Sequence, residues 1–289
     1  MKFIRYNNIE SFAADTFEIL LENEAQNSLP ISFIEDKELD KSDWFLAAVK
    51  GSDGGVLLTA AQTPPFNMLV YETRNIPNEA AVKLLADEIK KIDSQIVEFP
   101  RIPGILAERG LAERFAQNYA ADNGAEKHLQ MKIMRLNMMR LDKINEVEKA
   151  PGFCRPFRED DMFYAPYWER VFREDCGVEN FSIELNAKRL EHHLGKDSYY
   201  IWEDSHPVSQ AYNDWNTENG AMISGVYTPP YYRGRGYASS VTAALSRTLL
   251  ERKKYCCLFA NAANYAARGI YRKIGYYDIC EFEEIKFGD

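Results

Sequence analysis

A run of two arginines and two glycines is the stretch of this sequence best suited to bind an anion. Residues 233–236 (RGRG) follow the apolar residues 221–227 and lead directly into residues 237–253. In the last segment apolar residues recur at helical spacing, so an amphipathic helix is predicted there. A strand, a glycine loop and a helix in this order direct unpaired backbone N–H groups and a positive helix end at an anion. We therefore predict a pyrophosphate site at this loop.

The spacing separates this loop from two familiar phosphate loops. A P-loop requires lysine and then serine or threonine after its last glycine, but Tyr237 follows Gly236 here. A dinucleotide-binding fingerprint requires glycine or alanine where Ser239 stands. The stretch instead fits the pattern Arg-x-x-Gly-x-Ala, from Arg233 to Ala238. An ordinary basic turn before a helix remains the alternative.

A second motif follows a continuous apolar run at residues 255–260, which is typical of a buried central strand. The next predicted helix fits Asn-x-x-Ala-x-x-hydrophobic-Tyr-x-x-x-Gly-aromatic, from Asn264 through Tyr271 to Tyr276. Ligands of open α/β sheets gather at the carboxyl ends of such strands. The two motifs are therefore expected to serve one ligand.

Together the two motifs resemble the signatures of the GNAT superfamily of N-acetyltransferases. The sequence is most similar to bacterial-type tandem GNAT proteins, through residues 227–239 (YTPPYYRGRGYAS), 270–276 (IYRKIGY) and 280–287 (CEFEEIKF). It departs from the family at Tyr265, where a proline commonly follows the asparagine. The resemblance implies acetyl-CoA as co-substrate and direct attack by a primary amine in a ternary complex.

The resemblance also implies roles for individual residues. Backbone amides of residues 233–239 would hold the pyrophosphate, and residues 226–228 would bind the pantetheine arm like an added strand. Tyr271 would donate a proton to the departing thiolate, since a phenol with a pKa of about 10 is protonated at neutral pH. Asn264 as a mere helix cap and Tyr271 as a core aromatic residue remain alternatives. The implied cofactor-binding residues are Val226, Tyr227, Thr228, Arg233, Gly234, Arg235, Gly236, Tyr237, Ala238, Ser239 and Asn264.

The general base cannot be identified from the sequence. A carboxylate or histidine near the central strands could take the proton of an alkyl ammonium. The candidates are Glu203, Asp204, Asp214, Glu281 and Glu283, and each can equally be a solvated charge. The histidines have no metal-ligand or triad spacing, so no metal is expected.

The order of predicted elements is nearly the same in both halves of the chain. We predict an α/β (α+β) fold of two GNAT-like domains, each a mixed, mostly antiparallel sheet flanked by helices. Residues 1–142 would form a degenerate N-terminal domain, and residues 143–289 the domain with the acetyl-CoA site. At the position of the glycine loop the first half has residues 73–78 (TRNIPN), where Pro77 removes a backbone N–H. The first domain is therefore predicted not to bind a pyrophosphate.

The predicted elements follow from hydrophobic periodicity and from turn residues. In the first half they are helices 9–24 and 32–40, strands 44–50, 55–63 and 67–73, helix 78–92, strand 96–99, helix 104–121 and strand 127–141. In the second half they are helices 158–176 and 186–195, strands 198–203, 208–215 and 221–227, helix 237–253, strand 255–260, helix 264–274 and strand 276–287.

Composition limits the classes of function. The 289 residues suggest two domains, and a net charge of −9 argues against binding nucleic acid or an anionic membrane surface. The five cysteines are scattered and include no Cys-x-x-Cys pair. The sequence also has no signal-peptide core at its N-terminus and no long apolar run, so a cytoplasmic protein is predicted.

The predicted function is an N-acetyltransferase acting on a small-molecule or peptide amine. The alternatives are a non-catalytic acyl-CoA-binding sensor and an aminoacyl-tRNA-dependent transferase, which the acidic composition disfavours. The identity of the amine, the oligomeric state and whether the first domain shapes the acceptor site stay open.

Overall fold

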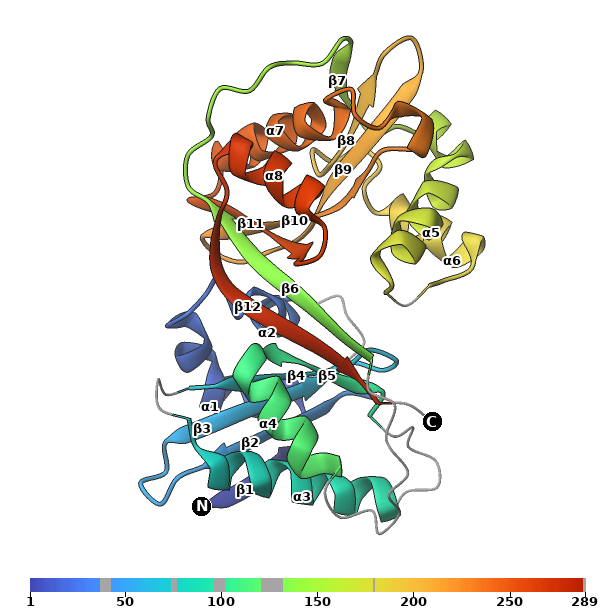
Figure 1. Cartoon of the computed structure of the whole chain (residues 1–289). Helices are drawn as coiled ribbons and strands as arrows, with labels where there is room; N and C mark the ends of the chain where they lie inside the picture. The colour runs from blue at the N-terminus through green and yellow to red at the C-terminus, as the bar shows by residue number, and fades with distance from the viewer. Residues whose placement is uncertain (37–42, 74–76, 96–101, 121–131, 179, 288–289) are drawn as a thin grey trace. The chain divides into compact units, whose positions relative to one another are not determined.

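The computed structural model describes residues 1–36, 43–73, 77–95, 102–120, 132–178 and 180–287 (Figure 1). The chain divides into two compact units. Unit 1 comprises Met1–Asn137 together with Cys280–Asp289, and unit 2 comprises Met138–Ile279. The predicted domains, 1–142 and 143–289, differ from these units chiefly in the last segment, because Cys280–Asp289 belongs to unit 1.

Unit 1 is a sheet in the order β1-β2-β3-β4-β5, to which the end of β12 is added beside β5. The pair β4–β5 is parallel, whereas β1–β2, β2–β3, β3–β4 and β5–β12 are antiparallel. Its elements are β1 (Lys2–Tyr6), α1 (Ile9–Leu21), α2 (Ser28–Glu35), β2 (Phe45–Lys50), β3 (Val56–Gln62), β4 (Met68–Glu72), α3 (Glu79–Gln95), β5 (Gly104–Glu108), α4 (Arg109–Ala120) and β12 (Tyr277–Lys286).

Unit 2 repeats this plan in the order β7-β8-β9-β10-β11, with the end of β6 beside β11. Here β10–β11 is the parallel pair, and β7–β8, β8–β9 and β9–β10 are antiparallel. Its elements are the end of β6 (Lys132–Leu141), β7 (Phe153–Pro156), η1 (Glu159–Phe163), α5 (Ala165–Cys176), α6 (Ile183–Glu191), β8 (Tyr199–Glu203), β9 (Pro207–Asn216), β10 (Gly220–Tyr227), η2 (Pro230–Tyr232), α7 (Tyr237–Leu250), β11 (Tyr255–Asn261) and α8 (Tyr265–Ile274). The first residues of β6, 132–137, belong to unit 1, and the first residues of β12, 277–279, belong to unit 2.

Helices cover both faces of the sheet in unit 2. Alternate residues of β10 and β11 pack against α7 and α8 around Val241, Leu245 and Ile274, together with Val208 and Ala211 of β9. On the opposite face Tyr199 and Tyr212 pack with α5 and α6 through Ala165 and Leu190. The predicted mixed, mostly antiparallel sheet flanked by helices is confirmed.

Several element boundaries differ from the sequence predictions. β1 and β7 were not expected, because each is a short strand in which polar or proline residues dilute the apolar pattern. Residues Gly104–Glu108 form β5 rather than the start of a helix, since they pair with β4 and β12. Helix α2 begins at Ser28 and α6 at Ile183, both earlier than predicted; Ser182 caps α6 by accepting from the Leu185 amide.

Other predictions lie wholly or partly outside the described residues. These are the strand at 96–99, the ends of the segments predicted at 32–40 and 127–141, and residues 74–76 of the first-half loop. Among the described residues no helix is long and apolar enough to cross a membrane.

Candidate functional site

The parallel strands β10 and β11 separate before either of them ends. Their paired residues run from Gly220 and Tyr255 to Ile223 and Leu258, although β10 continues to Tyr227 and β11 to Asn261. On its other edge β10 is irregular against β9 between Ser224 and Tyr227. The peptide groups of residues 224–227 therefore have no pairing partner on β11. An extended ligand could bind to them as an added strand.

Gly225 lies at the irregularity and has a backbone φ of +61°. A side chain there would collide with the ring of Tyr212, since a Cβ would stand 1.9 Å from its Cε1. Glycine therefore allows both the bulge in β10 and the close approach of Tyr212 from β9.

The glycine loop leads into the exposed N-terminus of α7. Gly236 is the N-cap residue with φ +83°, and no side chain caps the helix. Residues 233–236 are exposed, and a Cβ on Gly234 would have no neighbour within 4 Å. The first amides of α7 have no intrahelical acceptor, so they face an open, electropositive position.

Arg233 takes a different position from the one expected of a phosphate ligand. Its amide donates to the carbonyl oxygen of Pro230 (3.3 Å). Its guanidinium donates to the Thr228 carbonyl oxygen (2.9 Å) and to Asp175 (2.7 Å). The Arg233 side chain therefore stabilises the turn after β10, and the amides offered to an anion begin at Gly234. The side chain of Arg235 is exposed.

Further hydrogen bonds fix the two sides of the loop. The hydroxyls of Ser209 and Thr228 lie 2.8 Å apart, and Ser209 also donates to the Tyr227 carbonyl oxygen (3.0 Å). The Tyr237 hydroxyl donates to Asp204 (2.5 Å). Val226, Ala238 and Ser239 are half-buried.

Asn264 has the role of a helix cap. Its Oδ1 accepts from the Ala267 amide at 3.0 Å at the start of α8, and the residue is exposed. The cap orients the helix that carries Tyr271. Direct contact of Asn264 with a cofactor remains a prediction.

Tyr271 belongs to the core on the α7–α8 face and is 7% exposed. Burial, and then the nearby Cys176, raise the pKa of its phenol, so the hydroxyl keeps its proton at neutral pH. Cys176 ends α5, which covers the other face of the sheet. The Tyr271 ring packs against Tyr276 in this core, with ring centroids 6.0 Å apart. Within the described part of the chain its hydroxyl has no hydrogen-bond partner.

The candidate bases are dispersed. Glu203 forms an ion pair with Arg155, and Asp204 accepts from Tyr237. Asp214 lies on β9, and its exposed side chain accepts a hydrogen bond from Ser224. In unit 1, Glu281 and Glu283 form ion pairs, both with Arg109 and the latter also with Arg135. Asp214 alone of these candidates lies beside the bulged strand β10.

The sequence prediction overlooked Glu169 of α5. This residue is 4% exposed, and the hydroxyl of Tyr212 donates to its carboxylate at 3.1–3.2 Å. Burial raises the pKa of Glu169, and Asp214 adds to the rise, whereas Arg173 and the Tyr212 hydrogen bond lower it. Its sequence signal is a glutamate four residues after Ala165 on the buried side of an amphipathic helix.

The N-terminus of α3 in unit 1 differs from that of α7 in unit 2, because the carboxylate of Glu72 lies beside it. Glu72 at the end of β4 accepts from the Asn78 amide at 2.7 Å, and Asn78 is the residue that caps α3. Arg114 donates to the same carboxylate at 2.5 Å. The protein thus supplies its own anion at the N-terminus of α3.

Comparisons with known proteins bear on the fold of the chain. A family model described as FR47-like protein matches residues 205–285. A search among curated proteins finds no match. A GCN5-related N-acetyltransferase from Sphaerobacter thermophilus is similar with a TM-score of 0.65 at 14% identity, covering 99% of this chain and 95% of that one.

Two other solved structures are similar over almost the whole chain. A GNAT-family acetyltransferase from Colwellia psychrerythraea gives a TM-score of 0.59 at 11% identity, with coverage of 99% of this chain and 100% of that one. A tandem GNAT protein from the clavulanic acid biosynthesis pathway gives 0.60 at 10% identity, with coverage of 100% and 99%. The prediction of a tandem GNAT fold is confirmed.

Proposed function

We propose that this chain is an acetyl-CoA-dependent N-acetyltransferase whose unit 2 binds the cofactor. One observation carries the proposal: the strand β10, at its separation from β11, leads through η2 and the glycine loop to the open amides at the start of α7. The first feature fits a pyrophosphate and the second fits the extended pantetheine arm.

Each part of the cofactor then has a partner. The amides of residues 234–239 hold the pyrophosphate, and residues 226–228 pair with the pantetheine arm. The thioester lies where the strands separate, and the Val226 amide polarises its carbonyl group. Tyr271 is close to the sulfur and donates a proton to it as the thiolate leaves. The amine attacks directly, without a covalent acyl-enzyme.

The acceptor in this proposal is a primary amine of a small molecule or peptide. The net charge of −9 suits a cationic acceptor and disfavours a tRNA substrate. We also propose that the protein works in the cytoplasm, because its cysteines show no disulfide pattern.

The two units make the stoichiometry of binding a direct test. We expect calorimetric titration of the full chain with acetyl-CoA to give one site per chain, because Glu72 occupies the anion position at the N-terminus of α3 in unit 1. Two sites of similar affinity would contradict the assignment of unit 1, and no binding would contradict the proposed function.

A further inference from the structure

A polar cluster lies between the sheet of unit 2 and helices α5 and α6, beside the bulge of β10. We infer that Glu169, positioned by Tyr212, takes the proton from the acceptor's ammonium group in the proposed transfer. This inference rests on the proposed function and adds the residue that the transfer still needs. The cluster comprises Glu169, Arg173, Gln210, Tyr212, Asp214 and Ser224.

Tyr212 connects the Glu169 carboxylate to the part of β10 where the thioester is proposed to lie. The Tyr212 ring packs on Gly225, immediately before the Val226 amide, and its hydroxyl donates to both carboxylate oxygens. The preceding residue, Trp168, packs on Tyr227 with ring centroids 5.9 Å apart. Helix α5 thus contacts the end of β10 on the side opposite α8. Tyr271 and Glu169 lie on opposite faces of the sheet.

A second observation indicates that a polar ligand completes this cluster. Gln210 is 0% exposed, and its Oε1 accepts from the Tyr199 hydroxyl at 2.6 Å. Its Nε2 has no partner among the described residues. Gln210 pairs with Tyr227 and Tyr212 pairs with Ser224, so both side chains lie on the α5 face and flank the bulge. A buried donor without a partner costs free energy unless a ligand accepts from it.

The surroundings suit Glu169 to act as a base. Burial disfavours its charged form, and Asp214 disfavours it further. Arg173 and the hydrogen bond from the Tyr212 hydroxyl act in the opposite direction and lower the pKa of Glu169. His193 packs on Tyr212 at 5.2 Å, but burial lowers its pKa to about 3, so it does not titrate near neutral pH. The other titratable or charged groups nearby are Cys176 and Tyr199, with Arg189 and His192 facing Asp214.

Protons and bonds balance in the proposed transfer. The Glu169 carboxylate takes one proton from the ammonium, and the neutral amine attacks the thioester carbonyl carbon. The new C–N bond forms and the C–S bond breaks, while the thiolate takes a proton from the Tyr271 phenol. The second proton lost by the nitrogen restores the phenol, and the proton on Glu169 passes to solvent. The products are the acetamide, CoA thiol and one proton.

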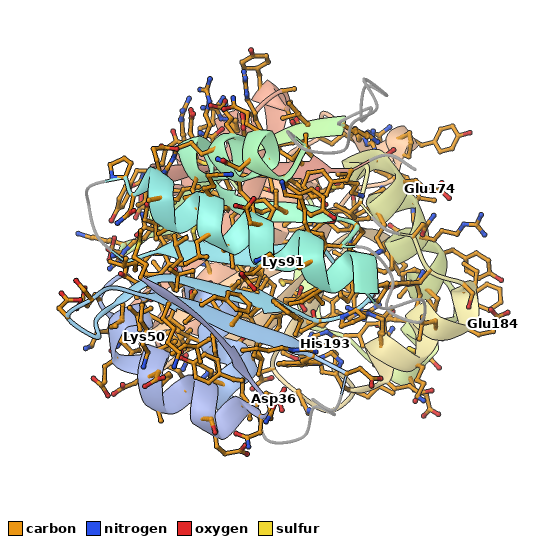
Figure 2. All side chains as sticks on the ribbon, turned by 90° about the horizontal axis from the view of Figure 1, so that it is seen from below. Asp36, Lys50, Lys91, Glu174, Glu184 and His193 are labelled. Atoms are coloured by element: carbon orange, nitrogen blue, oxygen red, sulfur yellow. The ribbon has the colours of Figure 1, made fainter. Side chains whose placement is uncertain are left out.

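The test compares Glu169→Gln with the wild-type chain and with Glu174→Gln. Glutamine can still accept from Tyr212 but cannot take a proton. Glu174 lies on the same helix, exposed and paired with Arg170 at 3.0 Å (Figure 2). We expect Glu169→Gln to lower kcat about 100-fold, to remove the acidic limb of the pH–rate profile and to leave acetyl-CoA affinity unchanged. Glu174→Gln should match the wild type in all three.

Stability provides a readout that needs no acceptor. A carboxyl whose pKa is raised on folding contributes stability at low pH, and this contribution is lost as pH rises through the folded-state pKa. Ionised Glu169 therefore destabilises the fold at pH 7.5. We expect the unfolding temperature of Glu169→Gln at that pH to equal or exceed that of the wild type. A clear decrease would assign Glu169 a structural role and overturn the inference.

Tyr212→Phe tests the positioning role. Removing the hydroxyl removes a hydrogen bond that lowers the pKa of Glu169, so the acidic limb should move to higher pH. A full-rate Glu169→Gln enzyme with an intact acidic limb would overturn the inference while leaving the proposed function standing. A wild-type chain that binds acetyl-CoA but acetylates none of a panel of primary amines would overturn both.

Discussion

Replacing Tyr271 with phenylalanine is expected to lower the rate of acetyl transfer by about 10²- to 10⁴-fold, the usual range for loss of a general acid. The substitution removes one hydroxyl and keeps the ring that packs in the α7–α8 core. The hydroxyl has no partner among the described residues, so no internal hydrogen bond is lost. Affinity for acetyl-CoA should therefore stay nearly constant, and the loss should appear in the chemical step.

Rapid-quench measurement of a single turnover separates chemistry from product release. A thioester has a fairly good leaving group, so a result near the lower end of the range is compatible with the account. Tyr276→Phe is a suitable control, because Tyr276 packs on Tyr271 while its hydroxyl lies 2.9 Å from that of Ser246. A Tyr271→Phe chain with the wild-type rate would remove this residue from the mechanism.

Replacing Gly236 with valine should weaken acetyl-CoA binding at least tenfold, or about 1.4 kcal/mol. The branched side chain would stand at the N-cap of α7, where the pyrophosphate must approach the amides. Backbone strain is a second consequence, because φ at Gly236 is +83°. Calorimetry with acetyl-CoA and a thermal melt separate the two effects.

Gly54→Val provides a matched control for strain. Gly54 has φ +81° and no atom within 4 Å of an added Cβ, and it lies between β2 and β3 in unit 1. At Gly236 an added Cβ would meet only the Ala150 Cβ at 3.6 Å, which is an ordinary contact. Both variants should lose similar stability, since both force valine into a left-handed conformation. If Gly54→Val weakened acetyl-CoA binding as much as Gly236→Val, the loss would reflect strain rather than a blocked phosphate site.

The position of the glycine loop at the start of a helix could be predicted from sequence, because it depends on local backbone geometry. Its role as a pyrophosphate site stays a prediction. Residues 233–236 have positive charge and conformational freedom next to a predicted helix start, and the structure places them at the exposed N-terminus of α7. The cap at Asn264 could also be predicted as one of two roles, because the side-chain oxygen of an asparagine before a helix can accept from the first helical amides.

Glu169 could not be singled out, because its environment depends on three elements far apart in the sequence. Helix α5 supplies the carboxylate, β9 supplies Tyr212, and β10 supplies the glycine against which Tyr212 packs. The sequence also could not predict which unit contains Cys280–Asp289. An alternating pattern predicts a strand without specifying which sheet it joins, and this segment pairs with β5 of unit 1. The contacts of Arg233 could not be predicted either, because its charge does not indicate that its guanidinium donates hydrogen bonds to Thr228 and Asp175.

The most direct test of the account is transfer of a labelled acetyl group by the full chain. Purified protein is incubated with ¹³C-acetyl-CoA and a panel of primary amines, and mass spectrometry detects labelled acetamides while free CoA thiol is measured. We expect a labelled product from at least one amine, with equal thiol release, and strong reduction of both in Tyr271→Phe. Binding of acetyl-CoA without any labelled product would contradict it and would indicate a protein that senses acyl-CoA.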